Sequence, residues 1–200
     1  NLNIYDDGSI KGETGSKKIT CEGVPTGRTD LVMNGRLVGF LSDNYFSKKF
    51  KNNLYNPISR NGFRYSAGGR DYKNKPGISP TNVIIEGNRE TTRDSLLKQV
   101  NNGVYIGRVW YTYAINGLAM GDFTSTIIAD SFLIKDGKIA SPLKPNTIRI
   151  NTNINHILNN IIGITKKKRS TLVWGSREVM IAPEIAVSNV QLDNITGFLA

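Results

Sequence analysis

Cysteine and histidine are almost absent from this sequence: Cys21 and His156 are the only ones among its 200 residues. One cysteine cannot form an internal disulfide bond, and a zinc site built from cysteines or histidines needs more of these residues than the chain provides. No apolar run approaches the roughly 18 residues that a membrane-spanning helix requires. These absences indicate a soluble, folded protein in a reducing, cytoplasmic environment.

Acidic residues are also few, with 16 Asp and Glu against 26 Lys and Arg, for a net charge of +10. Such a charge makes nucleic acid a candidate partner through attraction to phosphate. Tyrosine and arginine alternate in residues 63–72 (FRYSAGGRDY), but no recognition motif is present, so this function ranks low. The four consecutive cations at 166–169 (KKKR) are typical of a solvated turn.

The usual catalytic motifs are missing as well. Cys21 and His156 are the residue types of a cysteine hydrolase, but neither lies in a local signature of that class. The glycines of residues 67–70 (AGGR) do not have the spacing of a phosphate-binding loop, and no G-x-S-x-G motif occurs. Residues 6–8 (DDG) could bind a hard cation, although an exposed turn is the simpler expectation. The chain alone is expected to be catalytically inactive and to hold no metal.

Two hairpins are indicated by Asx-Gly pairs between apolar strands, at Asn34-Gly35 and at residues 136–137 (DG). A type I′ turn needs φ > 0 at both central positions, which these residues tolerate. The stretch from Cys21 to Thr26 is interpreted as a turn that leads into the first hairpin, held by a charge pair from Glu22 or Arg28. This interpretation needs no chemistry from Cys21.

Three helices are expected, at residues 43–50, 91–103 and from 153 onward. The first two begin at a capping residue, and the third is indicated by apolar residues at helical spacing. Alternating β-formers predict one strand at 104–115 and another at 123–134, and the tail adds two shorter candidates. Residues 52–80 form a long stretch without periodicity, which is typical of a functional or mobile loop. The fold class is therefore α+β, dominated by antiparallel sheets in a half-barrel of hairpins. We expect residues 1–200 to form a single domain.

The order of several blocks resembles the C-terminal domain of the TldD/PmbA family, also called modulator of DNA gyrase, which includes cytoplasmic metalloproteases. The blocks that carry the resemblance extend over nearly the whole chain. They are EGVPTGRTDLVMNGRLVGFLSD, RNGFRYSAGGRDYKNKPGISPTNVIIEGN, SLLKQVNNGVYIGRV, GDFTSTIIADSFLIKDGKIASPLK and NINHILNNIIGI.

The resemblance implies that this chain is the C-terminal fragment of a longer protein whose N-terminal α/β domain is absent here. In the TldD-type subunit of the family, an H-E-x-x-x-H helix of that domain and a cysteine near the C-terminus hold zinc. In this sequence Trp174 stands before Gly175, where that cysteine would stand. Because indole is not a zinc ligand, the resemblance implies a PmbA-like (TldE-like) subunit that pairs with a zinc-bearing TldD-like subunit or with itself.

The resemblance also implies that unfolded peptide binds as an added strand, with candidate contacts from Gly121, Asp122, Phe123, Trp174 and Gly175. Two alternatives remain. The parent protein could be an active zinc peptidase with a substituted ligand, and the carboxylates that could serve are Glu178 and Glu184. The third hypothesis is the basic nucleic-acid-binding module.

Overall fold

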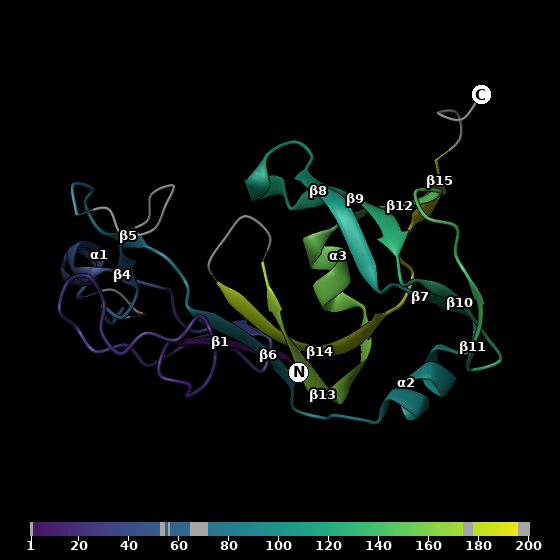
Figure 1. Cartoon of the computed structure of the whole chain (residues 1–200), viewed down its shortest axis with the longest axis horizontal. Coiled ribbons are helices and arrows are strands. Elements are labelled where there is room, and N and C mark those ends of the chain that lie inside the picture. The colour runs from purple at the N-terminus through teal and green to yellow at the C-terminus, as the bar shows by residue number, and fades with distance from the viewer. Residues whose placement is uncertain (1, 53–54, 56, 65–71, 174–177, 196–200) are drawn as a thin grey trace. The chain divides into compact units, whose positions relative to one another are not determined.

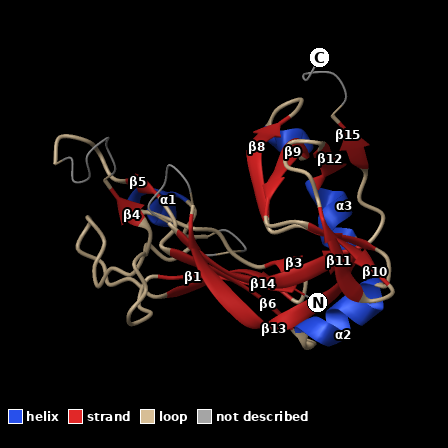
Figure 2. Cartoon of the chain, turned by 45° about the vertical axis from the view of Figure 1, so that its right-hand side comes forward, coloured by secondary structure: helices blue, strands red, loops and turns tan. Residues whose placement is uncertain are grey.

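The computed structural model describes residues 2–52, 55, 57–64, 72–173 and 178–195. Within this part of the chain, strands far outnumber helices (Figures 1 and 2). The expected α+β fold, dominated by strands, is confirmed. The residues group into two compact units, one made of 1–90 and 166–183 and the other of 91–165 and 184–200.

The first unit is built on a sheet with the strand order β13-β14-β6-β1-β2-β3. Its neighbours β3, β2, β1 and β6 are antiparallel, whereas β14 runs parallel to β6, so the sheet is mixed where only antiparallel pairing was expected. The first predicted hairpin is confirmed, because Asn34 has φ 53° and Gly35 has φ 77°. The strand bounds are β1 Leu2–Asp7, β2 Arg28–Met33, β3 Arg36–Leu37, β6 Asn82–Gly87, β13 Ile161–Leu172 and β14 Val179–Val187.

Glu22, beside Cys21, makes contacts that support the fold. The side chain of Glu22 accepts hydrogen bonds from the backbone N–H of Asn44 (2.8 Å) and from the Ser59 hydroxyl (3.2 Å). It thus helps to satisfy the start of helix α1 (Asn44–Lys49), whose N-cap Asp43 accepts from the N–H of Phe46 at 2.8 Å. The same unit contains the small hairpin β4 (Gly62–Phe63) and β5 (Gly77–Ile78), which lies within the long stretch predicted as loop.

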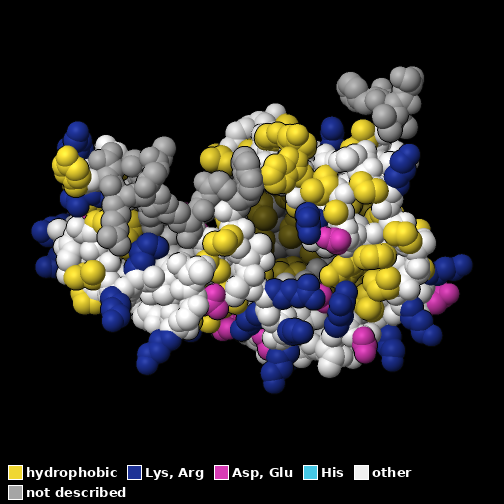
Figure 3. All heavy atoms as spheres, in the orientation of Figure 1, with side chains coloured by type: hydrophobic (Ala, Val, Ile, Leu, Met, Phe, Trp, Pro, Cys, Tyr) yellow, Lys and Arg dark blue, Asp and Glu magenta, His cyan; other side chains and the backbone are white. Residues whose placement is uncertain are grey.

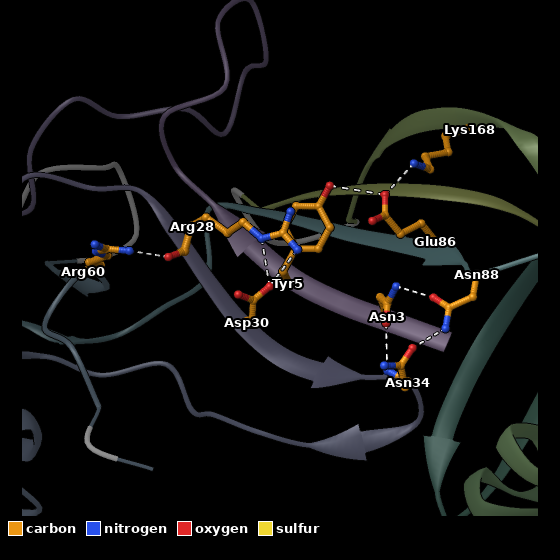
Figure 4. A network of polar contacts seen from close by, with 9 residues as sticks. All are labelled: Asn3, Tyr5, Arg28, Asp30, Asn34, Arg60, Glu86, Asn88 and Lys168. Atoms are coloured by element: carbon orange, nitrogen blue, oxygen red, sulfur yellow. Dashed lines mark hydrogen bonds and ion pairs between the residues drawn. The ribbon is translucent and has the colours of Figure 1, made fainter. Parts of the chain in front are cut away.

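A polar network covers one face of the first unit's sheet (Figure 4). The Arg28 guanidinium stacks on the Tyr5 ring at 3.7 Å and pairs with Asp30 at 2.8 Å. The Tyr5 hydroxyl lies 3.4 Å from Glu86, which also pairs with Lys168 at 2.8 Å. Burial and the Glu86 carboxylate raise the pKa of the Tyr5 phenol. Of the two residues considered for holding the turn near Cys21, Arg28 pairs with Asp30 and Glu22 binds the start of α1.

Replacing Arg28 with alanine is expected to lower the free energy of unfolding by about 1 kcal/mol, because the stacking on Tyr5 and a partly exposed ion pair are lost together. Urea denaturation measures this change. Arg36→Ala is the matched control on an exposed strand of the same sheet, and it should change stability by less than about 0.5 kcal/mol. Equal effects of the two substitutions would show that the stacked arginine contributes nothing specific.

Asp6 is buried, with 1% of its surface exposed, so the expectation of an exposed DDG turn is wrong. Its carboxylate accepts hydrogen bonds from the Thr81 N–H (2.6 Å), the Thr81 hydroxyl (3.0 Å) and the Asn61 amide (2.7 Å). Asn61 and Thr81 are themselves fully buried. Buried polar groups need hydrogen-bond partners. By providing them, this network joins β1 to the residue before β6 and to the segment before β4.

The second unit contains a four-stranded sheet of order β15-β12-β9-β8 and a three-stranded sheet of order β11-β10-β7. Within them, the neighbouring strands are antiparallel. The second predicted hairpin is confirmed by φ 50° at Asp136 and 72° at Gly137. The helices are α2 (Arg93–Val100) and α3 (Ile154–Asn159). The strand bounds are β7 Gly103–Tyr105, β8 Arg108–Ala114, β9 Asp122–Ala129, β10 Phe132–Lys135, β11 Lys138–Pro142, β12 Ile148–Asn153 and β15 Leu192–Asn194.

Two strands were predicted as continuous but are broken. The stretch 104–115 divides into β7 and β8, and 123–134 divides into β9 and β10. In both cases the two strands belong to different sheets, because β7 and β10 lie in the three-stranded sheet and β8 and β9 in the four-stranded one. Gly107 lies at the break, where an added Cβ would be 2.0 Å from the Asp130 carbonyl oxygen. Asp130 has φ 51°, which ends the opposing strand at the same level. The break therefore depends on a close backbone contact that periodicity does not reveal.

The KKKR run at 166–169 is not a turn but part of strand β13. In the described part of the chain, β13 is the last strand on its side of the six-stranded sheet. Charged side chains on such an edge oppose pairing with another molecule. The third helix is also shorter than expected, since α3 ends at Asn159 and Ile161 begins β13.

Candidate functional site

The candidate residues Gly121, Asp122 and Phe123 lie at the start of β9, after the short 3-10 helix Leu118–Met120. Gly121 has φ 76° and ends that helix in the left-handed region. All three residues are half-buried, and Phe123 is paired with Ala114 of β8 and Thr152 of β12. The turn therefore holds the opening of a central strand between its two neighbours.

Asn153 fixes this turn, although the sequence indicated it only as the start of the third helix. Its side-chain amide donates to the Met120 carbonyl and to the Asp122 carboxylate, both at 2.8 Å. Its side-chain oxygen accepts from the Asn155 N–H at 2.8 Å, at the start of α3. One side chain thus links the start of α3 to the candidate residues. Asparagine before an apolar helical pattern is typical of an N-cap, and this was the signal in the sequence that could have found it.

Gly121→Ala is expected to lower the free energy of unfolding by about 2 kcal/mol, because φ is positive and the new Cβ needs extra room. That Cβ would lie 2.8 Å from Cγ2 of Ile154. Gly12→Ala is the matched control, since Gly12 has φ 87° with no heavy atom within 4 Å of the added Cβ. It should cost only about 1 kcal/mol in thermal or urea unfolding. No difference between the two would exclude a contribution from the Ile154 contact.

Strand β8 forms an exposed edge beside the candidate residues. It is the last strand on its side of the four-stranded sheet in the described residues, and most of its side chains are exposed. Tyr111 and Tyr113 are 59% and 56% exposed, and their rings stack with centroids 6.1 Å apart. The Trp110 ring meets Tyr111 edge-on at 5.9 Å. Figure 3 shows hydrophobic atoms gathered where Figure 1 places β8 and the following turn.

The edge of β8 is irregular at Tyr111, which has φ 52° although it is not a glycine. The register shifts between Trp110 and Tyr113, where β8 advances three residues against two of β9, so one extra residue bulges from the strand. The Thr112 hydroxyl lies 2.7 Å from the buried Ser125 hydroxyl and anchors the bulge to β9. Bulges redirect side chains and are common beside functional sites.

Several candidates are not brought into this site. Trp174 and Gly175 lie outside the described residues. Cys21 is exposed and belongs to the first unit, while His156 belongs to the second. Both ring nitrogens of His156 have partners, the Asn189 carbonyl at 2.8 Å and the Asn160 amide at 3.3 Å. This histidine is therefore held as part of the fold.

The two carboxylates considered as substitute metal ligands already have partners. Glu178 accepts a hydrogen bond from the Ser79 hydroxyl at 3.1 Å. Glu184 pairs with Arg93 at 3.4 Å and lies 3.3 Å from the Tyr105 hydroxyl. Among the described residues, no group of three or more His, Cys, Asp or Glu side chains is arranged to hold a metal ion. None of the helices in the described segments is long and apolar enough to span a membrane.

The strand-rich fold is that of a domain found in a family of metallopeptidases. A family model for the PmbA/TldA metallopeptidase C-terminal domain matches residues 1–194. This chain therefore belongs to the PmbA/TldA family, in agreement with the resemblance in the sequence.

Curated relatives share 28–34% of the aligned residues with this chain. The "Metalloprotease TldD homolog" of Buchnera aphidicola (subsp. Acyrthosiphon pisum) is 28% identical over 147 residues, which are 72% of this chain and 27% of that protein. An uncharacterised protein of Methanocaldococcus jannaschii is 34% identical over 146 residues, 72% of this chain and 30% of its own length. The chain thus matches less than a third of either relative.

Solved structures share the fold. TldE from Thermococcus kodakarensis superposes with a TM-score of 0.73 at 25% identity, over 96% of this chain and 39% of that one. A Thermotoga maritima protein described as a proposed modulator of a DNA gyrase has a TM-score of 0.74 at 24% identity, again over 96% of this chain and 39% of that one.

Proposed function

We propose that this chain is the C-terminal domain of a longer TldE-like protein and supplies a sheet edge that binds extended peptide in a metallopeptidase assembly. The observation that carries the proposal is the exposed edge of β8, beside Gly121, Asp122 and Phe123. Backbone groups on such an edge hydrogen-bond to a peptide of any sequence, and aromatic side chains such as Tyr111 and Tyr113 add apolar contact. This mode suits a substrate that must be unfolded to bind.

We further propose that zinc is held by a partner subunit and not by this chain. Trp174 stands where the metal-bearing relatives of the family resemblance present cysteine, and indole is not a ligand. The ion pair between Glu184 and Arg93 supports the same proposal, because a paired carboxylate must lose its partner before it binds a metal. Relatives named TldD and TldE occur in the same family, which supports assembly with a TldD-like subunit. We propose that this assembly works in the cytoplasm.

Peptide addition to β8 is tested with the 200-residue chain and the labelled peptide SVTVSVTS, followed by fluorescence anisotropy. An analogue N-methylated at alternate backbone nitrogens lacks the donors that strand pairing requires. It should bind about ten-fold more weakly than the unmodified peptide. Equal affinity of the two peptides would exclude strand addition.

Tyr113→Ala locates the binding at β8, because it removes one of the exposed rings without touching the core. We expect a loss of affinity of about five-fold, the size typical of one aromatic contact. The matched control is Tyr72→Ala in the first unit, where the side chain is 82% exposed. If both tyrosine variants bind the peptide like the wild type, the peptide does not bind along β8.

A further inference from the structure

An apolar groove lies in the first unit, away from the strands of its main sheet. It encloses about 220 Å³ between the segment before α1, one side of α1 and strand β5. Its walls are almost entirely apolar. The lining side chains include Phe40, Phe46, Phe50, Tyr55, Pro57 and Ile78.

The groove is preformed by aromatic contacts. Phe40 meets Tyr55 edge-on at 4.9 Å, and Phe46 stacks parallel to Phe50 at 5.9 Å. These packed rings nevertheless stay open to solvent: Phe40 is 47%, Phe46 38% and Phe50 40% exposed. Exposed aromatic side chains that cluster around a hollow are typical of a binding surface.

The size of the groove limits what fits. Pockets for cofactors and drug-sized ligands enclose about 300–1,000 Å³, and this groove is smaller. One large apolar side chain of a bound peptide is of the right size. The groove therefore suits an anchor residue, as in the short segments that bind other proteins through one or two buried side chains.

The rim of the groove is positively charged. Lys48 and Lys49 lie in the last turn of α1, and Lys51 follows. The Lys49 ammonium lies 5.6 Å from the Tyr45 ring centroid and 5.8 Å from that of Phe50. Figure 3 shows Lys and Arg atoms around the hydrophobic atoms at the end of the view where Figure 1 places α1.

Carboxylates do not balance these cations. Asp43 is the only acidic residue between positions 40 and 60. Its side chain is buried and caps the start of α1, and Glu22 binds the same end of that helix. In the described residues, the groove therefore combines an apolar hollow with uncompensated lysines.

We propose that this groove binds an acidic segment of a partner protein through one large apolar anchor, with the flanking carboxylates on Lys49 and its neighbours. The anchor supplies affinity, and the complementary charge supplies orientation and a faster association rate. The segment is recognised by its side chains, whereas the proposed binding at β8 depends on the backbone. The two proposals can therefore be tested separately, with different peptides.

The test uses the 200-residue chain and three labelled peptides in fluorescence anisotropy: GDDFDDG, GKKFKKG and GDDADDG. GDDFDDG should bind about ten-fold more tightly than either other peptide, because only it has both the anchor and the acidic flanks. Higher salt should weaken its binding. Equal binding of GDDFDDG and GKKFKKG would overturn the proposal.

Lys49→Glu reverses one rim charge and should weaken GDDFDDG binding about ten-fold while leaving SVTVSVTS binding unchanged. Lys11→Glu makes the same change at an exposed lysine elsewhere in the unit and should have less than a two-fold effect on GDDFDDG binding.

Sedimentation velocity tests whether a second copy of this chain occupies the groove. Self-association that disappears in Ile78→Glu, or equal effects of both lysine variants, would overturn the proposal.

Discussion

Replacing Asp6 with alanine is expected to lower the free energy of unfolding by about 3 kcal/mol, or roughly a hundred-fold in the folding equilibrium. The reason is that the Asp6 carboxylate accepts hydrogen bonds from buried groups. Without the carboxylate, the buried N–H of Thr81 and the buried amide of Asn61 each lose an acceptor. Water cannot replace these partners at positions that are 0% exposed.

Urea denaturation of the wild type and Asp6→Ala measures this cost. Asp7→Ala is the matched control in the same strand, since the Asp7 carboxylate accepts hydrogen bonds from Ser9 at the surface. It should cost no more than about 1 kcal/mol. Comparable midpoints for the two alanine variants would mean that the buried carboxylate does not hold β1 to its neighbours.

The pH dependence of stability carries a separate prediction. Burial raises the pKa of the Asp6 carboxyl above its ordinary value of 3.8, and the hydrogen bonds from Thr81 and Asn61 oppose this change. Between 3.8 and the raised value, the folded chain retains a proton that the unfolded chain has lost. The contribution of Asp6 to stability therefore falls as pH rises through this window.

Unfolding free energies of the wild type and Asp6→Asn, measured across that window, isolate this effect because asparagine does not titrate. The wild type should lose stability relative to Asp6→Asn as the pH rises. A gain of the wild type over the variant in the same window would mean that the hydrogen bonds outweigh burial and that the folded pKa is lowered.

Ile127→Ala is the second substitution with a large expected effect, about 3 kcal/mol, because it leaves a cavity in the core of the second unit. Ile127 is 2% exposed and is paired with Val109 of β8, so it supports the strand that carries the proposed binding edge. Peptide binding to β8 should weaken near the unfolding midpoint of this variant. Leu118→Ala, at a side chain that is 90% exposed, is the control and should be nearly neutral.

Thermal unfolding of Asp6→Ala and Ile127→Ala also tests whether the chain behaves as a single domain, as we propose. The chain passes from one unit to the other inside β13 and again inside β14. We expect one cooperative transition that both substitutions shift downward. Two transitions, each lowered by only one substitution, would contradict the proposal.

Local signals in the sequence predicted the elements that local chemistry determines. Both Asx-Gly hairpins and all three helix starts are present, because φ > 0 turns, N-caps and apolar spacing depend on a few neighbouring residues. The bulge at Tyr111 and the strand breaks near Gly107 depend on contacts with β9 and Asp130, which are distant in sequence. The burial of Asp6 likewise depends on Asn61 and Thr81, which are distant in sequence. The neighbouring residues alone therefore predicted an exposed turn.

The candidate site followed a similar division. The family resemblance directed attention to residues 121–123, where the structure has a turn beside an exposed edge strand. Asn153, which holds that turn, was expected only at the start of the third helix, and the stretch 104–115 was predicted as a strand with no indication that it lies at an edge. Whether a strand lies at an exposed edge depends on which strands pair with it. Pairing between segments far apart in the chain cannot be predicted from a short stretch of sequence.

Zinc content of the full-length protein that contains this domain, purified without its partner and measured by mass spectrometry, tests most directly whether the chain leaves metal binding to another subunit. We expect about one tenth of a zinc ion per chain or less after dialysis. One zinc ion per chain, retained by the isolated protein, would contradict the assignment to the metal-free type of subunit.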